Sequence, residues 1–250
     1  ILKIMILGDG LDLVIVGSIG YDDIQTPYGK VSSLLGGSAS YSGLSAAFHA
    51  RDMGLERVSV GLVSIIGSDF DETSYRRIVD AGLDIEGVKQ SDGMTFRWSG
   101  KYEGSMDHAI TVSTDVNVLS DFKPTLPASW KDPTILFCAS ASPATQIEVL
   151  NANQGSKVTA LDTFQLWIDS EFSGLSEALR KVDIAIFNED EVNAIGDGQN
   201  FLESGRNIIT GQSLNGGELA GSGPQCLIIK RGSAGCVCIH RDGLIILPAY

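Results

Sequence analysis

Four groups of polar residues stand where the sequence predicts that strands end, and their types suit the binding of hydroxyl groups, phosphate or Mg²⁺. They are Asp22 with Asp23, Asp162, residues 188–191 (Asn-Glu-Asp-Glu) and residues 230–232 (Lys-Arg-Gly). In open parallel sheets, ligands bind beyond the carboxyl ends of the strands. A single acid at such a place is usually a helix cap or a solvated loop residue. Four polar groups at one predicted edge instead favour a binding site.

Asn188 and Glu191 are three residues apart at the start of a predicted helix, so they share one face of its first turn. Two interpretations of this pair stay open. An amide oxygen and a carboxylate suit Mg²⁺, which keeps most of its waters and takes few protein ligands. The same pair fits a capping box, with Asn188 as the N-cap and Glu191 reaching back to its N–H.

Lys230 and the glycines that follow it form a second candidate site for an anion. Gly232 and Gly235 place flexible backbone N–H groups beside the lysine cation, as a polyphosphate requires. Taken alone, this pattern is a weak signal.

The glycine pair Gly36-Gly37 precedes a run of small residues that is expected to form a helix ending near Ala50. Glycine permits positive φ and close backbone approach, and a helix start favours an electron-rich partner. The run fits a helix packed tightly on a sheet, or the floor of a substrate site.

The elements that position these residues alternate between strands and helices, which indicates parallel strands with right-handed crossovers. Strands are expected at 13–17, 57–63, 134–138, 157–161, 183–187 and 226–229. Helices are expected at 69–81 with Asp69 as N-cap, and at 144–151, 175–181, 188–195 and 201–210. Residues 211–223 read as a mobile loop, and a hairpin is expected around Asp242-Gly243.

Residues from about 84 to 118 break this alternation. The segments 95–102 and 108–112 alternate in polarity between glycines, which is typical of antiparallel strands with one solvated face. Such an insertion is a candidate lid over a pocket. Phe96 and Trp98 share one face of it and Arg97 lies on the other. These residues could face a substrate or form a lid–lid dimer contact, because an exposed sheet edge favours pairing.

Charge and cysteine usage exclude several classes of protein. A net charge of −13 argues against binding nucleic acid or an anionic membrane surface, because both require clustered Lys and Arg. The four cysteines lack metal-binding spacing, and buried reduced thiols are expected. The apolar run 1–7 is too short to span a bilayer and lacks the features of a signal peptide. A cytoplasmic location is therefore expected.

In combination, these patterns resemble the PfkB (ribokinase-like) kinases. The glycine-pair helix, residues 188–191 and residues 227–235 follow in the family's order, and the resemblance extends from about Asp12 to Tyr250. It implies one ribokinase-like α/β domain over residues 1–250, three-layered (α/β/α), with a mostly parallel central sheet. It also implies a small antiparallel β lid from segments at about 18–34 and 84–118.

The resemblance further implies ATP-dependent phosphorylation of a hydroxyl on a sugar, nucleoside or polyol, with Mg²⁺ as a cofactor. A homodimer through the lid is one possible form of assembly. Asp22 matches the family's acid that holds substrate hydroxyls, and Gly36 and Gly37 match its substrate-loop glycines. Many members have asparagine four residues after the second glycine, where this chain has Tyr41. Tyr41 is therefore a candidate substrate-binding residue, and a common pentose is a less secure substrate.

On the nucleotide side, Asn188 and Glu191 match the N-x-x-E motif that positions Mg²⁺ and phosphate through water. Lys230 and Gly232, with Gly235, match the turn beside the nucleotide phosphates. The family's Gly-Ala-Gly-Asp motif, which supplies the catalytic base and the anion hole, normally follows soon after a segment like 247–250. The given sequence ends before it, so no catalytic base is expected within these 250 residues, and the chain as given is expected to be inactive or nearly so.

Two alternatives come from other functional classes. A degenerate member of the fold could bind a partner without catalysis, although Asp22, Asn188, Glu191 and Lys230 together argue against it. An NAD(P)-dependent oxidoreductase is suggested by the opening strand and its glycines. However, residues 17–20 do not form Gly-x-Gly-x-x-Gly, and a lid-like segment follows in place of a helix.

Overall fold

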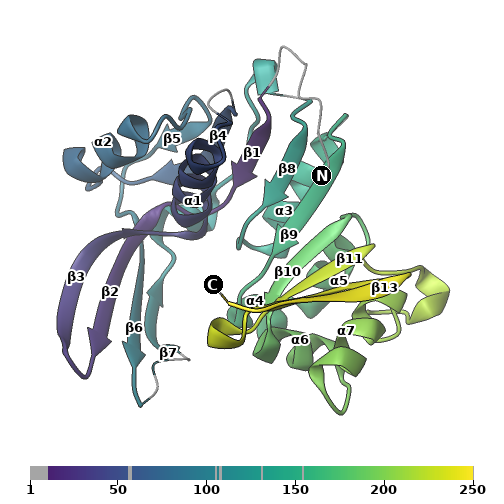
Figure 1. The fold of residues 1–250 in the computed structure, drawn as a ribbon. Helices are drawn as coiled ribbons and strands as arrows, with labels where there is room; N and C mark the ends of the chain where they lie inside the picture. The colour runs from purple at the N-terminus through teal and green to yellow at the C-terminus, as the bar shows by residue number, and fades with distance from the viewer. Residues whose placement is uncertain are drawn as a thin grey trace. The chain divides into compact units, whose positions relative to one another are not determined.

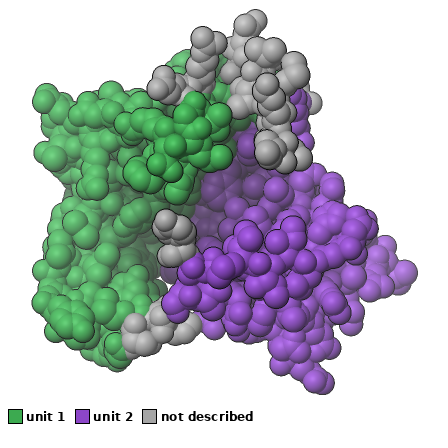
Figure 2. All heavy atoms as spheres, in the orientation of Figure 1, with its two compact units in different colours: residues 1–134 green, residues 135–250 purple. Residues whose placement is uncertain are grey.

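The computed structural model describes residues 11–55, 58–104, 106, 109–130, 132–153 and 155–249. The chain divides into two compact units, residues 1–134 and 135–250 (Figure 1; Figure 2). The expectations for the run 1–7, for Arg57 at a strand start and for His108 in the lid fall outside the described residues.

The core of the first unit is a parallel ladder in the order β1-β4-β5. Its strands are β1 (Leu13–Val16), β4 (Val60–Ile66) and β5 (Val88–Gln90). Its helices are α1 (Ser38–Asp52) and α2 (Glu72–Asp80), with 3₁₀ turns η1 (Asn117–Asp121) and η2 (Ala128–Trp130). All seven residues of β4 are buried, as a continuous apolar run predicts. Gly43 lets α1 lie close to β4, because a Cβ there would stand 2.9 Å from Leu62.

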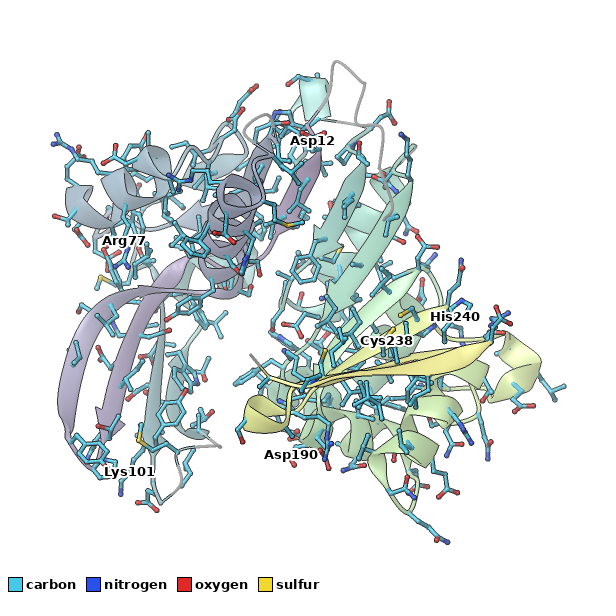
Figure 3. All side chains as sticks on the ribbon, viewed as in Figure 1. Asp12, Arg77, Lys101, Asp190, Cys238 and His240 are labelled. Atoms are coloured by element: carbon cyan, nitrogen blue, oxygen red, sulfur yellow. The ribbon has the colours of Figure 1, made fainter. Side chains whose placement is uncertain are left out.

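A second sheet in this unit forms the lid, in the order β3-β2-β6-β7. Its strands are β2 (Gly20–Thr26), β3 (Gly29–Gly36), β6 (Phe96–Tyr102) and β7 (Ala109–Asp115). The pairs β2-β3 and β6-β7 are antiparallel, but β2 pairs with β6 in parallel. The expectation of a purely antiparallel lid is therefore wrong. Both β2 and β6 leave the core in the same direction, and Lys101 of β6 marks the far end of the lid in Figure 3.

The start of α2 differs from the prediction. Asp71, not Asp69, is the N-cap, and its carboxylate accepts hydrogen bonds from the Ser74 N–H at 2.9 Å and the Tyr21 hydroxyl at 2.6 Å. Asp69 instead accepts hydrogen bonds from the N–H and the hydroxyl of Thr95, at 2.7 and 2.6 Å. It thereby ties the residue before β6 to the loop after β4.

The second unit contains six neighbouring strands in the order β8-β9-β10-β11-β12-β13. These are β8 (Ile135–Cys138), β9 (Val158–Asp162), β10 (Ile184–Asn188), β11 (Cys226–Lys230), β12 (Cys236–His240) and β13 (Gly243–Leu247). The first four are parallel and the last two antiparallel, as the hairpin predicted near Asp242 requires. The helices are α3 (Pro143–Ala152), α4 (Gln165–Ser170), α5 (Phe172–Leu179), α6 (Glu189–Gly196) and α7 (Phe201–Thr210), with 3₁₀ turns η3 (Glu218–Ala220) and η4 (Gly232–Ala234).

The glycine-rich segment 211–223 is irregular, as predicted, and Arg180 anchors it. The guanidinium of Arg180 donates to the carbonyls of Asn215 at 2.9 Å, Gly217 at 3.1 Å, and Gly221. The mobility of the segment stays a prediction.

All four cysteines are unbridged, with Cys138 buried and the other three partly exposed. The sulfur atoms of Cys226 on β11 and Cys238 on β12 lie 3.0 Å apart. Within the described ranges, no helix is both long enough and apolar enough to cross a bilayer.

Candidate functional site

The first cluster of candidate residues forms around Asp22 in the first unit. Gly36 is the last residue of β3, and a Cβ at this position would collide with the Asp22 carboxylate. Gly37 has a φ of 95°, and a Cβ there would stand 2.5 Å from the Ser18 carbonyl oxygen. The two glycines are thus required by close approach and, at Gly37, by positive φ. The structure brings the predicted residues Asp22, Gly36 and Gly37 together.

Asp22 and Tyr41 form a hydrogen-bonded pair. The Tyr41 hydroxyl, from the first turn of α1, donates to Asp22 Oδ2 at 2.9 Å. Asp22 is only 6% exposed, and burial raises the pKa of its carboxyl above the usual value, with the nearby Asp23 charge adding to the effect. Burial and the Asp22 charge also raise the pKa of Tyr41 to about 12. Tyr41 therefore stays a hydrogen-bond donor, while its side chain remains half exposed.

The start of α1 is partly closed to ligands by the protein itself. The Ser38 N–H donates to the Ser18 hydroxyl at 2.9 Å, and the Ala39 N–H donates to the Ser18 carbonyl at 2.9 Å. In return, the Ser18 N–H donates to the Ser38 hydroxyl at 3.1 Å. Two N–H groups of the first turn thus fix α1 against the residues after β1, which supports the packing interpretation of this helix.

Asp23 and the lid residues near it are engaged with each other. Asp23 Oδ1 accepts hydrogen bonds from the Ser33 N–H at 2.8 Å and from Arg97 Nη1 at 3.2 Å. The Arg97 guanidinium also lies over the Tyr21 ring, 5.3 Å from its centre. Trp98 donates through Nε1 to the Thr111 hydroxyl at 3.2 Å. Of the two adjacent acids, Asp22 is therefore the better placed to accept hydroxyl groups from a substrate.

The second cluster lies in the second unit, at the carboxyl ends of three neighbouring parallel strands. Asp162 ends β9, Asn188 ends β10 and Lys230 ends β11, and the register pairs Asn188 with Lys230. Lys230 Nζ lies 3.5 Å from Asp162 Oδ1. Burial raises the pKa of the Asp162 carboxyl, and Lys230 opposes that rise. Parallel pairing thus gathers three of the four predicted polar groups at neighbouring strand ends of the second unit. The fourth group, Asp22 with Asp23, lies within β2 of the lid and not at a strand end as predicted.

Asn188 and Glu191 form the capping box that the spacing allowed. The Glu191 N–H donates to Asn188 Oδ1, and the Asn188 N–H donates to Glu191 Oε2, both at 2.8 Å. Glu191 is 6% exposed, and burial raises the pKa of its carboxyl to about 7, with the Asp162 charge adding to the effect. Asp190, labelled in Figure 3, lies beside it on the same turn of α6. The box leaves the second carboxylate oxygen of Glu191 outside these two bonds.

The turn after Lys230 is tight, and its glycines have different roles. Gly232 and Gly235 have φ values of 53° and 87°. A Cβ on Gly235 would collide with the Leu247 carbonyl, so this glycine permits the close approach of β13. Arg231, in contrast, turns away to pair with Glu189 at 2.7 Å and to lie over the Phe201 ring. Lys230 is thus the cation of this turn that contacts Asp162.

Among the described residues, no group of three or more His, Cys, Asp or Glu side chains is arranged to hold a metal ion. The Asp162 and Glu191 carboxylates instead provide oxygen ligands of the kind that Mg²⁺ contacts directly or through water. Asp162 Oδ1 is buried and, apart from its ion pair with Lys230, makes no hydrogen bond with the described residues. These observations fit a hydrated Mg²⁺ with few protein ligands.

Sequence reasoning missed one buried polar residue beside this cluster. Gln146 lies on α3, is 1% exposed, and donates to the carbonyl of Asp162 at 2.8 Å. Its only signal in the sequence is its position on a stripe with Pro143, Val149 and Leu150, which are all buried.

Comparisons with known proteins agree with the fold described above. No model of a known protein family matches the sequence. A cytidine kinase of Thermococcus kodakarensis is 26% identical over 243 residues, which are 96% of this chain and 79% of the relative.

Among solved structures, a nucleoside kinase of Methanocaldococcus jannaschii, described as an archaeal member of the ribokinase family, matches with a TM-score of 0.67 and 16% identity. The match covers 96% of this chain and 77% of that one. A Burkholderia thailandensis nucleoside kinase in complex with ADP-inosine matches with a TM-score of 0.70 and 18% identity, over 95% of this chain and 75% of that one. The predicted ribokinase-like α/β fold, mostly parallel and with a small lid sheet, is thereby confirmed.

Proposed function

We propose that this chain is a small-molecule kinase of the PfkB (ribokinase-like) family and that it transfers the γ-phosphoryl group of ATP to a hydroxyl of a nucleoside. The observation that carries this proposal is the buried Asp22 carboxylate, which lies against Gly36 in a chain related to a cytidine kinase. The names of the nucleoside kinases with a similar fold support the same substrate class.

The proposed role of the Asp22 cluster is to hold the acceptor. An ionised carboxylate accepts hydrogen bonds from substrate hydroxyls, and the bond from Tyr41 occupies only one of its lone-pair sites. Gly36 lets the Asp22 carboxylate lie directly against the backbone, and Gly37 lets α1 begin close to Ser18, because a Cβ at either position would collide with these groups. Tyr41 presents a half-exposed ring and a hydroxyl beside this carboxylate. We assign these four residues to substrate binding.

The proposed role of the second cluster is to bind the nucleotide phosphates and Mg²⁺. Lys230 supplies a cation, and the turn with Gly232 and Gly235 exposes backbone near it. Asn188 and Glu191 would contact Mg²⁺ through water, and the charge of Asp162 acts on the Glu191 carboxyl beside them. When bound, Mg²⁺ neutralises phosphate charge that develops during transfer. A cation here also offsets the cost of holding the Asp162 and Glu191 carboxylates in a desolvated site, which raises both of their pKa values.

Phosphoryl transfer depends mainly on positioning and electrostatics, so each cluster contributes by orienting its own ligand. The lid is proposed to exclude water, which otherwise competes with the acceptor hydroxyl. The hydrogen bonds from Thr95 to Asp69 hold the residue before β6 in place, and they thereby fix where the lid strand begins. We propose that this lid consists of the segments at about 18–34 and 84–118.

Assembly through the lid is proposed as well. Val31 on β3 and Ile110 and Val112 on β7 are half or more exposed, and β3 and β7 are the edges of the lid sheet. Light scattering at several concentrations tests this. A dimer that an Ile110→Lys substitution dissociates supports the contact, and a dimer that survives it contradicts the contact.

Calorimetric titration with a panel of nucleosides and sugars tests the acceptor site. We expect a nucleoside, cytidine first, to bind with micromolar to millimolar affinity, and Asp22→Asn to weaken that binding at least tenfold. Asp23→Asn is the matched control, because Asp23 is already occupied by Ser33 and Arg97. If Asp22→Asn binds nucleoside as tightly as the unchanged protein, the assignment of Asp22 is wrong.

A further inference from the structure

Gln146 is a polar residue placed where an apolar one is expected. It belongs to the face of α3 that carries Pro143, Val149 and Leu150, all of them buried. Burying an amide costs free energy unless the amide forms hydrogen bonds. A glutamine on this face therefore needs hydrogen-bond partners that offset the cost of burying its amide.

The partners of Gln146 are backbone carbonyls at the ends of two strands. Its Nε2 group lies 2.8 Å from the Asp162 carbonyl, 3.2 Å from the Ala139 carbonyl and 3.4 Å from the Cys138 carbonyl. Cys138 ends β8 and Asp162 ends β9, and the last residue pair of this ladder is Cys138 with Leu161. The Gln146 side chain thus joins β8 and β9 by hydrogen bonds just beyond the last residue pair of their ladder.

This contact acts on the residue that faces Lys230. The Gln146 amide holds the carbonyl of Asp162, while the carboxylate of the same residue lies 3.5 Å from Lys230 Nζ. Gln146 Oε1 makes no hydrogen bond with any described residue, so the amide is held through its Nε2 side alone. Three carbonyls on one side also fix which way the amide points, because Oε1 would repel them.

We propose that Gln146 is a positioning residue that clamps the carboxyl ends of β8 and β9 and thereby sets the place of the Asp162 carboxylate opposite Lys230. It does not itself touch a ligand. The link to Mg·ATP rests on the proposed function, whereas the clamp on the strand ends does not.

Gln146→Met tests the clamp, because methionine has similar length and shape but no donor. We expect the dissociation constant for Mg·ATP to rise about tenfold, the scale set by losing one or two hydrogen bonds. We also expect faster hydrogen exchange at the backbone N–H groups of Thr163 and Phe164. Val149→Ala is the matched control, since it opens a cavity on the same buried face and leaves the Asp162 carbonyl contact in place.

If Gln146 had only a structural role, both substitutions would lower stability, and the two variants would not differ in Mg·ATP affinity or in exchange rates. Equal Mg·ATP affinity and equal exchange rates at 163–164 in Gln146→Met and Val149→Ala would overturn the proposal. A double-mutant cycle adds a second criterion: with Asp162→Ala already present, Gln146→Met should change Mg·ATP affinity less than twofold. A full additive effect would show that Gln146 does not act through Asp162.

Two further outcomes separate this proposal from the proposed function. If the unchanged protein fails to bind Mg·ATP, the proposed function fails, and the exchange rates at 163–164 decide the clamp alone. If Gln146→Met does not fold, the unchanged protein is used. Its Gln146 side-chain amide protons should exchange slowly in NMR spectra, and rapid exchange would overturn the clamp.

Discussion

Glu191→Gln should make the protein more stable at pH 8 while weakening its binding of Mg·ATP. Burial raises the pKa of Glu191 from 4.5 to about 7. A carboxyl with a raised folded-state pKa contributes stability in its protonated form, fully below pH 4.5, and this contribution is lost as pH rises to about 7. Above pH 7 the folded protein carries a buried charge that destabilises it.

The size of this effect follows from the two pKa values. One pKa unit corresponds to about 1.4 kcal/mol, so the difference corresponds to about 3 kcal/mol at pH 8. Glutamine keeps an oxygen that can accept the Asn188 N–H bond, so the capping box survives. We expect Glu191→Gln to raise the free energy of unfolding at pH 8 by about 1–3 kcal/mol. At pH 4.5 the gain should be a fraction of that.

Urea unfolding at both pH values measures the difference directly. Glu148→Gln is the matched control, because it makes the same substitution at an exposed carboxylate of the same unit. The reasoning is refuted if Glu191→Gln destabilises the protein at pH 8, or if its effect does not depend on pH. Unchanged Mg·ATP binding in this variant would separately contradict the proposed role of Glu191.

Three further substitutions test other parts of the structure. Tyr41→Phe removes the donor to Asp22 and should cost about 1–2 kcal/mol of unfolding free energy in urea unfolding. Tyr28→Phe, at a 90% exposed residue, should cost nothing measurable. Gly36→Ala drives a methyl group into the Asp22 carboxylate and should weaken nucleoside binding at least tenfold in calorimetry; Gly243→Ala, where a Cβ meets nothing within 4 Å, should leave it unchanged. Asp71→Ala removes both the α2 cap and the hydrogen-bond partner of Tyr21, and it should lower the free energy of unfolding in urea by about 1–2 kcal/mol. A loss no larger than that of Asp80→Ala, at the other end of α2, would contradict the cap assignment.

The sequence predicts most of the core, because its strands are continuous apolar runs bounded by glycine and polar residues. The strand expected at 183–187 illustrates this, because it is observed as β10 at Ile184–Asn188. β4 is shifted: it lies at Val60–Ile66, whereas the sequence predicts a strand at 57–63. The helix expected at 201–210 is observed with those bounds. The lid pairing could not be predicted, since alternation fixes which face a residue takes but not the direction of its neighbouring strand. Asp69 and Asp71 both precede α2, and only the tertiary contacts with Thr95 and Tyr21 decide which one caps it.

The candidate site was predictable where chemistry depends on a strand end and unpredictable where it depends on packing. Asp22, Asn188 and Lys230 stand beside glycines or helix starts, which are visible in the sequence. The need for glycine at position 36 arises from the Asp22 carboxylate, which comes from another strand. Gln146 reads as a surface residue of a helix, and only the position of α3 against β8 and β9 shows that it is buried.

Product analysis tests the central claim most directly. The protein is incubated with Mg²⁺, ATP and a panel of nucleosides and sugars, and products are identified by mass spectrometry. We expect a nucleoside monophosphate and ADP in equal amounts, with loss of product in Asp22→Asn. Phosphorylation of sugars but of no nucleoside would contradict the substrate class, and the absence of any phosphorylated product from the folded protein would contradict the kinase assignment.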